Sequence, residues 1–173
     1  VWVGTGSAAI RSNVIIGRGI YKSTDAGKTW QFMGLREAGQ IGSVVVHPTN
    51  PETVWAAALG SPFGPNAERG IFKTTDGGKS WRKVLYVDEQ TGGADVAMVE
   101  GSPNRLFASM WQYRRWPDYF KSGGPGSGLY SSLDGGETWK EITRNPGLPT
   151  GLIGRIGVAL TAANPNRVYA LVE

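Results

Sequence analysis

The sequence contains no cysteine, one histidine and three methionines among its 173 residues. The lack of cysteine excludes disulfide bonds and thiolate chemistry from this chain. No apolar run approaches the roughly 18 residues that a membrane-spanning helix needs, so no span is predicted. The 18 lysines and arginines are scattered along the chain instead of forming a stripe. Without such a stripe or a known nucleic-acid-binding module, we expect no nucleic acid partner.

Glycine and tryptophan, in contrast, are abundant, with 26 and seven residues, which favours a turn-rich β protein with aromatic packing. One short motif occurs three times, as Ser23–Trp30, Thr74–Trp81 and Ser132–Trp139. The copies recur at intervals of about 50–60 residues and are flanked by strand-like segments. Periods of roughly this length are typical of the blades of β-propellers.

Each motif copy is predicted to be a hairpin turn. The aspartates Asp25, Asp76 and Asp134 can accept hydrogen bonds from backbone N–H groups of the turn, and a following glycine supplies a positive φ. The tryptophans Trp30, Trp81 and Trp139 begin the next strand and can pack under the turn. Each copy offers one carboxylate, whereas a hard cation prefers six or more oxygen ligands. We therefore predict a structural role for these residues and no metal ion.

A second regularity lies between the motif copies. A strand, a turn rich in proline and asparagine, and another strand recur, which gives a repeat of four strands, A to D, from the inside outwards. Complete blades are predicted at 41–87 and 94–143, and partial blades at 1–35 and 155–173. Because both ends fall inside a blade, we expect either the rest of a longer propeller or a self-associated copy to complete the ring.

The motif copies resemble the Asp-box (BNR) repeats, Ser/Thr-x-Asp-x-Gly-x-Thr-Trp, of sialidase-type and sortilin-type β-propellers. The surrounding sequence, such as His47–Pro51 and Asn164–Tyr169, is most similar to sortilin-like propellers of large secreted bacterial proteins, which are often labelled glycosyl hydrolases. The resemblance implies an all-β, partial β-propeller of four-stranded antiparallel blades, with two complete and two incomplete. It also implies a secreted or cell-surface protein whose Asp boxes are structural and lie away from its binding sites.

Binding is predicted on the face that carries the B–C and D–A loops, because these loops differ from blade to blade. The B–C loops are 5–18, 60–69 and 112–127, and the D–A loops are 36–40, 88–93 and 144–154. The segment 111–121 is richest in aromatic and basic side chains, which can stack on sugar rings or peptide side chains and bind carboxylates. The predicted contacts are Tyr113, Arg114, Arg115, Trp116 and Tyr119. Alternatively, the aromatic residues hold the loop on the propeller while the charges face water. Glu68 and Arg69 either contribute a second part of the binding site or form a surface ion pair.

Two functions remain open at this point. The first is a non-catalytic binding or scaffold module for a protein, peptide or glycan, without metal or organic cofactor. The alternative is a glycoside hydrolase, sialidase-like or xyloglucanase-like, which needs two carboxylates about 5–9.5 Å apart. Candidates on the loop face are Glu37, Glu68, Asp88, Glu89, Asp95 and Asp118, and no pair is singled out, so the catalytic residues are unassigned. A sialidase would also need clustered arginines and a nucleophilic tyrosine, for which Tyr113 is available.

Overall fold

The computed structural model describes residues 1–11 and 13–173, and its regular elements are β-strands apart from one short 3-10 helix, η1 (Arg36–Ala38). The first seven strands are β1 (Trp2–Gly4), β2 (Ile20–Lys22), β3 (Gln31–Phe32), β4 (Gln40–Val46), β5 (Val54–Gly60), β6 (Gly70–Thr74) and β7 (Arg82–Leu85). The others are β8 (Thr91–Val99), β9 (Ser102–Arg115), β10 (Phe120–Ser122), β11 (Gly128–Ser132), β12 (Lys140–Glu141), β13 (Ile156–Leu160) and β14 (Val168–Val172).

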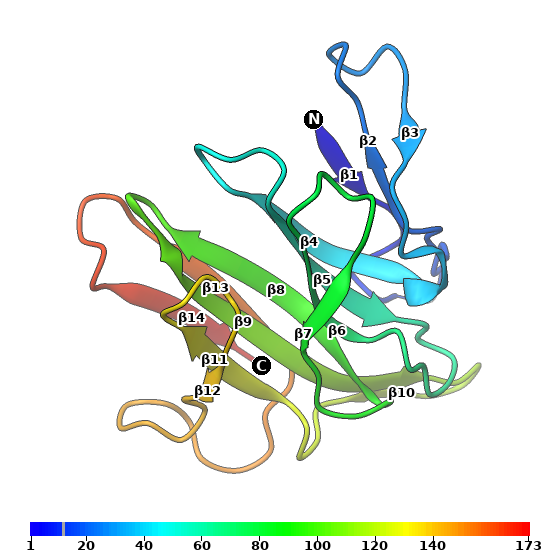
Figure 1. Ribbon diagram of the computed structural model, residues 1–173. Helices are drawn as coiled ribbons and strands as arrows, with labels where there is room; N and C mark the ends of the chain where they lie inside the picture. Colours follow the sequence, from blue (N-terminus) through cyan, green and yellow to red (C-terminus); the bar gives the residue numbers. More distant parts are fainter. Residues whose placement is uncertain (12) are drawn as a thin grey trace.

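These strands form antiparallel sheets that lie side by side in a fan (Figure 1). The sheet orders are β1-β2-β3, β4-β5-β6-β7, β8-β9-β11-β12 with β10 added to β9, and β13-β14. The leading strand β8 contacts both β4 and β13, so the first strands of successive sheets are neighbours along one edge of the fan. The predicted all-β fold of antiparallel sheets, with strands paired in chain order, is confirmed.

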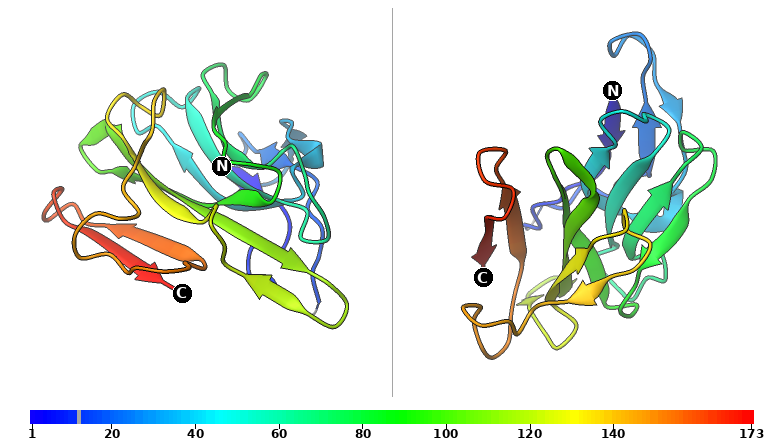
Figure 2. Two further views of the ribbon diagram at one scale, coloured as in Figure 1. Left: turned by 90° about the horizontal axis from the view of Figure 1, so that it is seen from below. Right: turned by 60° about the vertical axis from the view of Figure 1, so that its left-hand side comes forward.

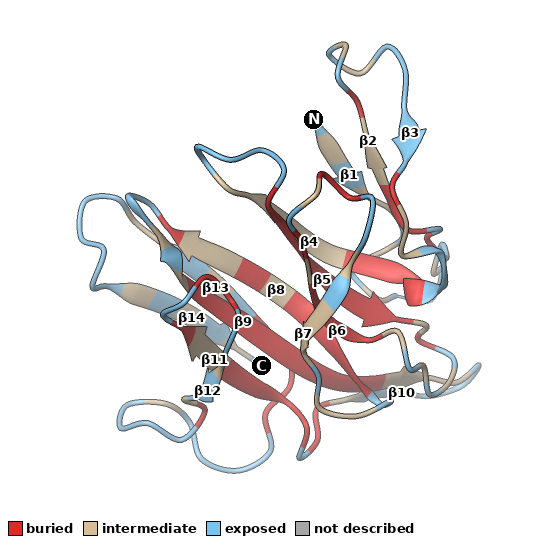
Figure 3. Ribbon diagram, in the orientation of Figure 1, coloured by how far each residue is buried: buried red, intermediate tan, exposed pale blue. Residues whose placement is uncertain are grey.

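The core lies between the sheets, and β5 shows why. Its side chains alternate between two apolar clusters: Ala56 and Ala58 pack with Ile20 of the preceding sheet, whereas Trp55 and Ala57 pack towards the following one. All seven residues of β5 are buried, and Figure 3 colours this strand as buried. A strand covered on both faces needs apolar residues at every position, and small ones let the sheets approach closely. The run of three alanines in this strand meets both demands.

The three Asp-box turns have the same hydrogen-bonding pattern. In the second, the Asp76 carboxylate accepts bonds from the Ser80 backbone N–H (3.0 Å), the Ser80 hydroxyl (2.6 Å) and the Thr74 hydroxyl (2.7 Å). Asp25 and Asp134 are bonded by the equivalent residues of their own turns. Each carboxylate thus stabilises the turn that connects the last two strands of its sheet.

Each of the last two Asp-box turns also packs on the sheet that precedes it in the chain. The indole N–H of Trp81 donates to the carbonyl oxygen of Met33 (2.6 Å), and the Trp81 ring meets Trp2 edge-on. In the third turn, the Gly135 carbonyl oxygen accepts from the indole N–H of Trp55 (3.1 Å) and from the ammonium group of Lys73 (2.8 Å). The turns therefore join neighbouring sheets as well as neighbouring strands.

Acid should destabilise the fold through these turns. Hydrogen bonds from the Thr29 hydroxyl and backbone N–H lower the pKa of Asp25 from 3.8 to about 2, and equivalent bonds from Ser80 and Thr138 lower the pKa of Asp76 and of Asp134 further. Because these carboxylates are more acidic in the fold than in the unfolded chain, their stabilisation is complete above pH 4 and is lost as the pH falls through 2. We expect the urea midpoint to drop steadily between pH 4 and pH 2, and less so in Asp76→Asn. A midpoint unchanged down to pH 2 would contradict this expectation.

One predicted loop is in fact a β-hairpin. Residues 112–127 were expected to form an open B–C loop, but β9 continues to Arg115 and pairs with β10, with Arg115 opposite Phe120 and Tyr113 opposite Ser122. The bulky aromatic and long side chains from Trp111 onwards suit a pleated strand. Trp116–Tyr119 makes the turn, in which the Trp116 N–H donates to the Tyr119 carbonyl oxygen (2.7 Å).

Candidate functional site

The β9–β10 hairpin projects from the fan on the loop face (Figure 2). Its base is packed in an aromatic cluster. The rings of Trp111 and Tyr113 stack with centroids 4.4 Å apart, and Phe120 meets Trp111 edge-on at 5.9 Å. Ala8 and Ile10, from the loop 5–18, pack against this cluster. Ser12 of that loop lies outside the described residues. The hairpin is thus seated on a packed base.

Tyr113 belongs to this base. Its side chain is buried and donates a hydrogen bond from its hydroxyl to the carbonyl oxygen of Gly60 (2.9 Å). Burial raises the pKa of Tyr113 to about 12. A buried phenol that is used as a donor and is this weakly acidic is unsuited both to contact a ligand and to act as the nucleophile of a sialidase-type reaction.

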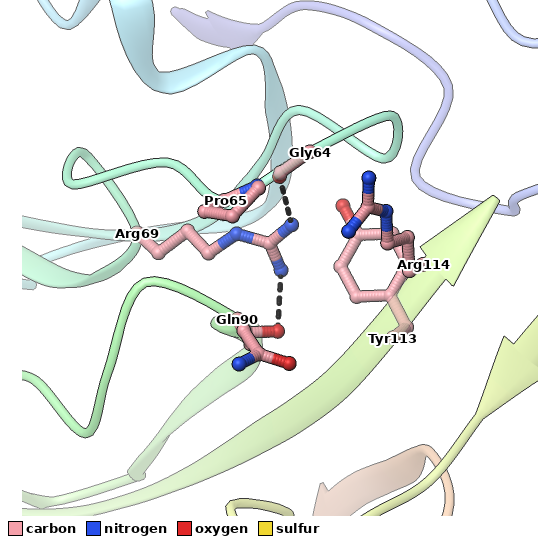
Figure 4. Close-up of a pocket in the computed structure, with 6 residues that line it drawn as sticks. All are labelled: Gly64, Pro65, Arg69, Gln90, Tyr113 and Arg114. Atoms are coloured by element: carbon pink, nitrogen blue, oxygen red, sulfur yellow. Dashed lines mark hydrogen bonds between the residues drawn. The ribbon is translucent and has the colours of Figure 1, made fainter. Parts of the chain in front are cut away.

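Arg69 connects the base to the two neighbouring loops (Figure 4). Its guanidinium donates to the carbonyl oxygens of Gln90 (2.8 Å), Ser61 (2.6 Å) and Gly64 (3.2 Å), and lies 4.7 Å from the centre of the Tyr113 ring. The side chain is 1% exposed, so it is not half of a surface ion pair with Glu68. Burial lowers the pKa of Arg69, although nearby Tyr113 and Asp88 favour its charged form.

A glycine makes room for this arginine. Gly60, at the end of β5, has a φ of 78°, and a Cβ at this position would lie 2.3 Å from the Cγ atom of Arg69. Glycine alone combines the positive φ with the absence of a side chain here. The sequence signal for Arg69 is weak, because a Glu-Arg pair after a polar loop is typical of an exposed segment.

The hairpin tip holds the accessible members of the predicted site. Tyr119 is 58% exposed, and its ring lies 5.7 Å from that of the half-buried Trp116. Arg114 is half-buried with its guanidinium 4.7 Å from the Trp116 ring, and Arg115, also half-buried, donates its backbone N–H to the Pro62 carbonyl oxygen (2.7 Å). The structure therefore brings four of the five predicted contacts together at the tip and places the fifth, Tyr113, beneath them.

The candidate carboxylates lie in η1, in β8 and in three loops. Glu37, in η1, borders a surface hollow of about 280 Å³ together with Arg18 and Arg36. Asp88 accepts a hydrogen bond from the Gln90 N–H (2.8 Å) in the β7–β8 loop, and Asp95, in β8, accepts one from the Val158 N–H (3.1 Å). Glu68 lies half-buried before β6, whereas Glu89 and Asp118 are exposed in different loops. Sequence and geometry together assign no catalytic pair.

The model of the family Sortilin-Vps10, described as sortilin, neurotensin receptor 3, matches residues 18–147. The chain belongs to this family. The curated relatives of this Sortilin-Vps10 chain include a xyloglucanase of Hypocrea jecorina (strain QM6a), 27% identical over 154 residues, and a sialidase of Bacteroides fragilis (strain YCH46), 26% identical over 152 residues. These matches cover 88% and 70% of the chain.

Solved structures show the same fold. An ancestral GH74 enzyme superimposes with a TM-score of 0.66 at 20% identity over 97% of the chain, and the GH74 enzyme of Niastella koreensis with 0.62 at 22% identity over 96%. The chain spans 21% and 22% of these two enzymes, 16% of the xyloglucanase and 28% of the sialidase. It therefore corresponds to less than a third of each relative.

Among the described residues, no helix is long and apolar enough to cross a membrane.

Proposed function

We propose that this chain is the glycan-binding part of a secreted glycoside hydrolase that acts on a polysaccharide, and that the tip of the β9–β10 hairpin contacts the glycan. The observation that carries the proposal is the exposed Tyr119 ring beside the half-buried Trp116 ring, on a hairpin with a packed base. The relatives named xyloglucanase and sialidase support the choice of a glycan over other ligands. A polysaccharide outside the cell requires an enzyme that is exported.

The shape of the face suits an extended ligand. The cavity beside Arg69, Tyr113 and Arg114 has a volume of about 10 Å³, which is room for one water molecule and not for a sugar ring. A glycan would therefore lie across the tip, where aromatic rings present an apolar face together with a polar edge. The two rings contact each other and the Arg114 guanidinium lies over the Trp116 ring, so part of this arrangement is formed before a ligand binds and the ordering cost of binding is reduced.

Peptide recognition without catalysis is a second candidate, because the matching family is described by sortilin, neurotensin receptor 3. The two candidates differ in a simple observation. A hydrolase releases new reducing ends from its polysaccharide, whereas a peptide receptor binds its ligand and releases nothing. Reducing-end assays on the full-length protein with a panel of polysaccharides decide between them.

Removal of the two tip rings should weaken glycan binding strongly. In the full-length protein, we expect Trp116→Ala/Tyr119→Ala to lower the affinity for xyloglucan oligosaccharides at least tenfold, because truncated aromatic anchors cost more than about 1.4 kcal/mol each at interfaces. Isothermal titration calorimetry measures the affinity. The melting temperature should move by only a few degrees, since the rings cover little of the core.

Leu133→Ala is the control, because Leu133 is an exposed (78%) large apolar residue in the third Asp-box turn, away from the hairpin tip. Its affinity should equal that of the unmodified protein. Unchanged affinity in the double variant would show that the tip is not the contact surface. Unfolding of the double variant would show instead that the two rings support the hairpin.

A further inference from the structure

Three arginines lie over the aromatic side chains that follow one another along β9 and into its turn. The guanidinium of Arg155 is 5.5 Å from the Trp111 ring, that of Arg69 is 4.7 Å from the Tyr113 ring, and that of Arg114 is 4.7 Å from the Trp116 ring. Positive charge is thus concentrated around the hairpin on which the glycan is proposed to lie. These contacts come from different sheets and loops, so the concentration is a product of the fold.

This charge is not neutralised by ion pairs. Within residues 1–11 and 13–173, the ion pairs are Lys22–Glu52, Lys73–Glu137 and Arg82–Glu137, which involve the Asp-box turns and the A–B turn of the opposite face. The guanidinium groups of Arg69 and Arg155 donate to backbone carbonyl oxygens instead. Asp88 favours the charged form of Arg69 from a longer distance.

Of the three, Arg114 alone lies on the hairpin itself, where it is half-buried. Its Nε atom is buried and has no hydrogen-bond partner among the described residues, and it borders the small cavity next to Arg69. Its register partner across the hairpin is Lys121, so two cations face each other on adjacent strands. Like charges at directly opposed positions destabilise a sheet. An anion bound between the side chains of Arg114 and Lys121 would remove this repulsion.

We propose that the glycan is acidic, and that Arg114, assisted by Lys121, binds a sugar carboxylate while the sugar ring stacks on Trp116. The inference rests on the proposed function and specifies its substrate class. A guanidinium offers two parallel N–H donors that match the two oxygens of a carboxylate, whereas an ammonium group offers a point charge. Arg114 would therefore provide the orientation and Lys121 additional attraction.

The test compares two ligands on the full-length protein by calorimetry: a glucuronic-acid-containing xylan oligosaccharide and a neutral xyloglucan oligosaccharide. We expect the acidic ligand to bind at least tenfold more tightly, and the difference to shrink as sodium chloride is raised from 50 to 300 mM. Arg114→Gln should abolish the difference, so that the acidic and the neutral ligand bind this variant with equal affinity. Arg114→Lys, which keeps the charge but loses the paired donors, should recover part of the difference.

Arg167→Gln is the control, since it removes the same charge from an exposed residue before β14, on the face of the A–B turns. It should leave the preference for the acidic ligand unchanged. Equal affinity of the unmodified protein for both glycans, or a preference that survives Arg114→Gln, would overturn the inference while the proposed function stands. If neither glycan binds and an acidic peptide does, the proposed function fails and the inference fails with it.

Discussion

Replacing Trp55 with alanine is expected to lower the free energy of unfolding by about 3–5 kcal/mol, the usual cost of truncating a large aromatic residue in a core. Trp55 is 1% exposed and packs between two sheets, and its indole N–H is bonded to the Gly135 carbonyl oxygen of the next Asp-box turn. The substitution removes core volume and one link between sheets at once. Urea unfolding followed by circular dichroism measures the effect.

Trp30→Ala is the matched control for this prediction. Trp30 is the tryptophan of the first Asp box and is 44% exposed, and among the described residues it belongs to none of the apolar clusters between sheets. We expect its replacement to cost less than about 1 kcal/mol, as is usual for partly exposed positions. Equal losses for Trp55 and Trp30 would show that packing between the sheets does not dominate stability.

Replacing Arg69 with alanine should cost about 2–4 kcal/mol and also disorder the loop face. The change leaves the carbonyl oxygens of Ser61 and Gly64 without their donor, removes one of two donors to the Gln90 carbonyl oxygen, and removes the contact with the Tyr113 ring. Loss of one partner from a buried polar group carries the full cost of its desolvation. Urea unfolding gives the stability, and near-ultraviolet circular dichroism reports on the stacked Trp111 and Tyr113.

Arg69→Lys separates the charge of this residue from its geometry. A lysine keeps the positive charge but cannot reach the three carbonyl oxygens with a planar set of donors, so we expect an intermediate loss of stability. Arg36→Ala, at an exposed position of η1, serves as the control and should have little effect. If Arg69→Ala cost no more than this control, the loops would be held by their own backbone bonds.

The Asp-box turns and the order of strands could be predicted because their causes are local. A serine or threonine, an aspartate and one or two glycines determine each turn by bonds within eight residues, and in the first turn Ala26 takes the place of a glycine at a φ of 60°. The hairpin was missed because its pairing joins Arg115 to Phe120 across a short Trp-Pro-Asp-Tyr turn that is equally typical of an open loop.

The candidate site was predictable only in part for a related reason. Because β9 extends to Arg115, its side chains alternate between the two faces of the sheet. Tyr113 therefore lies on the same face as Trp111 and packs against it in the base of the hairpin. Without the strand, all five residues of the segment were equally plausible contacts. Arg69 depends on partners in loops up to 21 residues away and on the room left by Gly60, and neither is visible in the residues next to it.

The packing of the second and third Asp-box turns on the preceding sheet gives the chain a direction of assembly. Trp81 needs Met33 and Trp2, and Gly135 needs Trp55 and Lys73, so each of these turns depends on residues that are synthesised before it. A polypeptide leaves the ribosome with its N-terminus first. Each of these sheets can therefore pack on a preceding sheet that has already folded when it emerges from the ribosome. The exposed face of the folded part would thus be covered before the rest of the protein is synthesised.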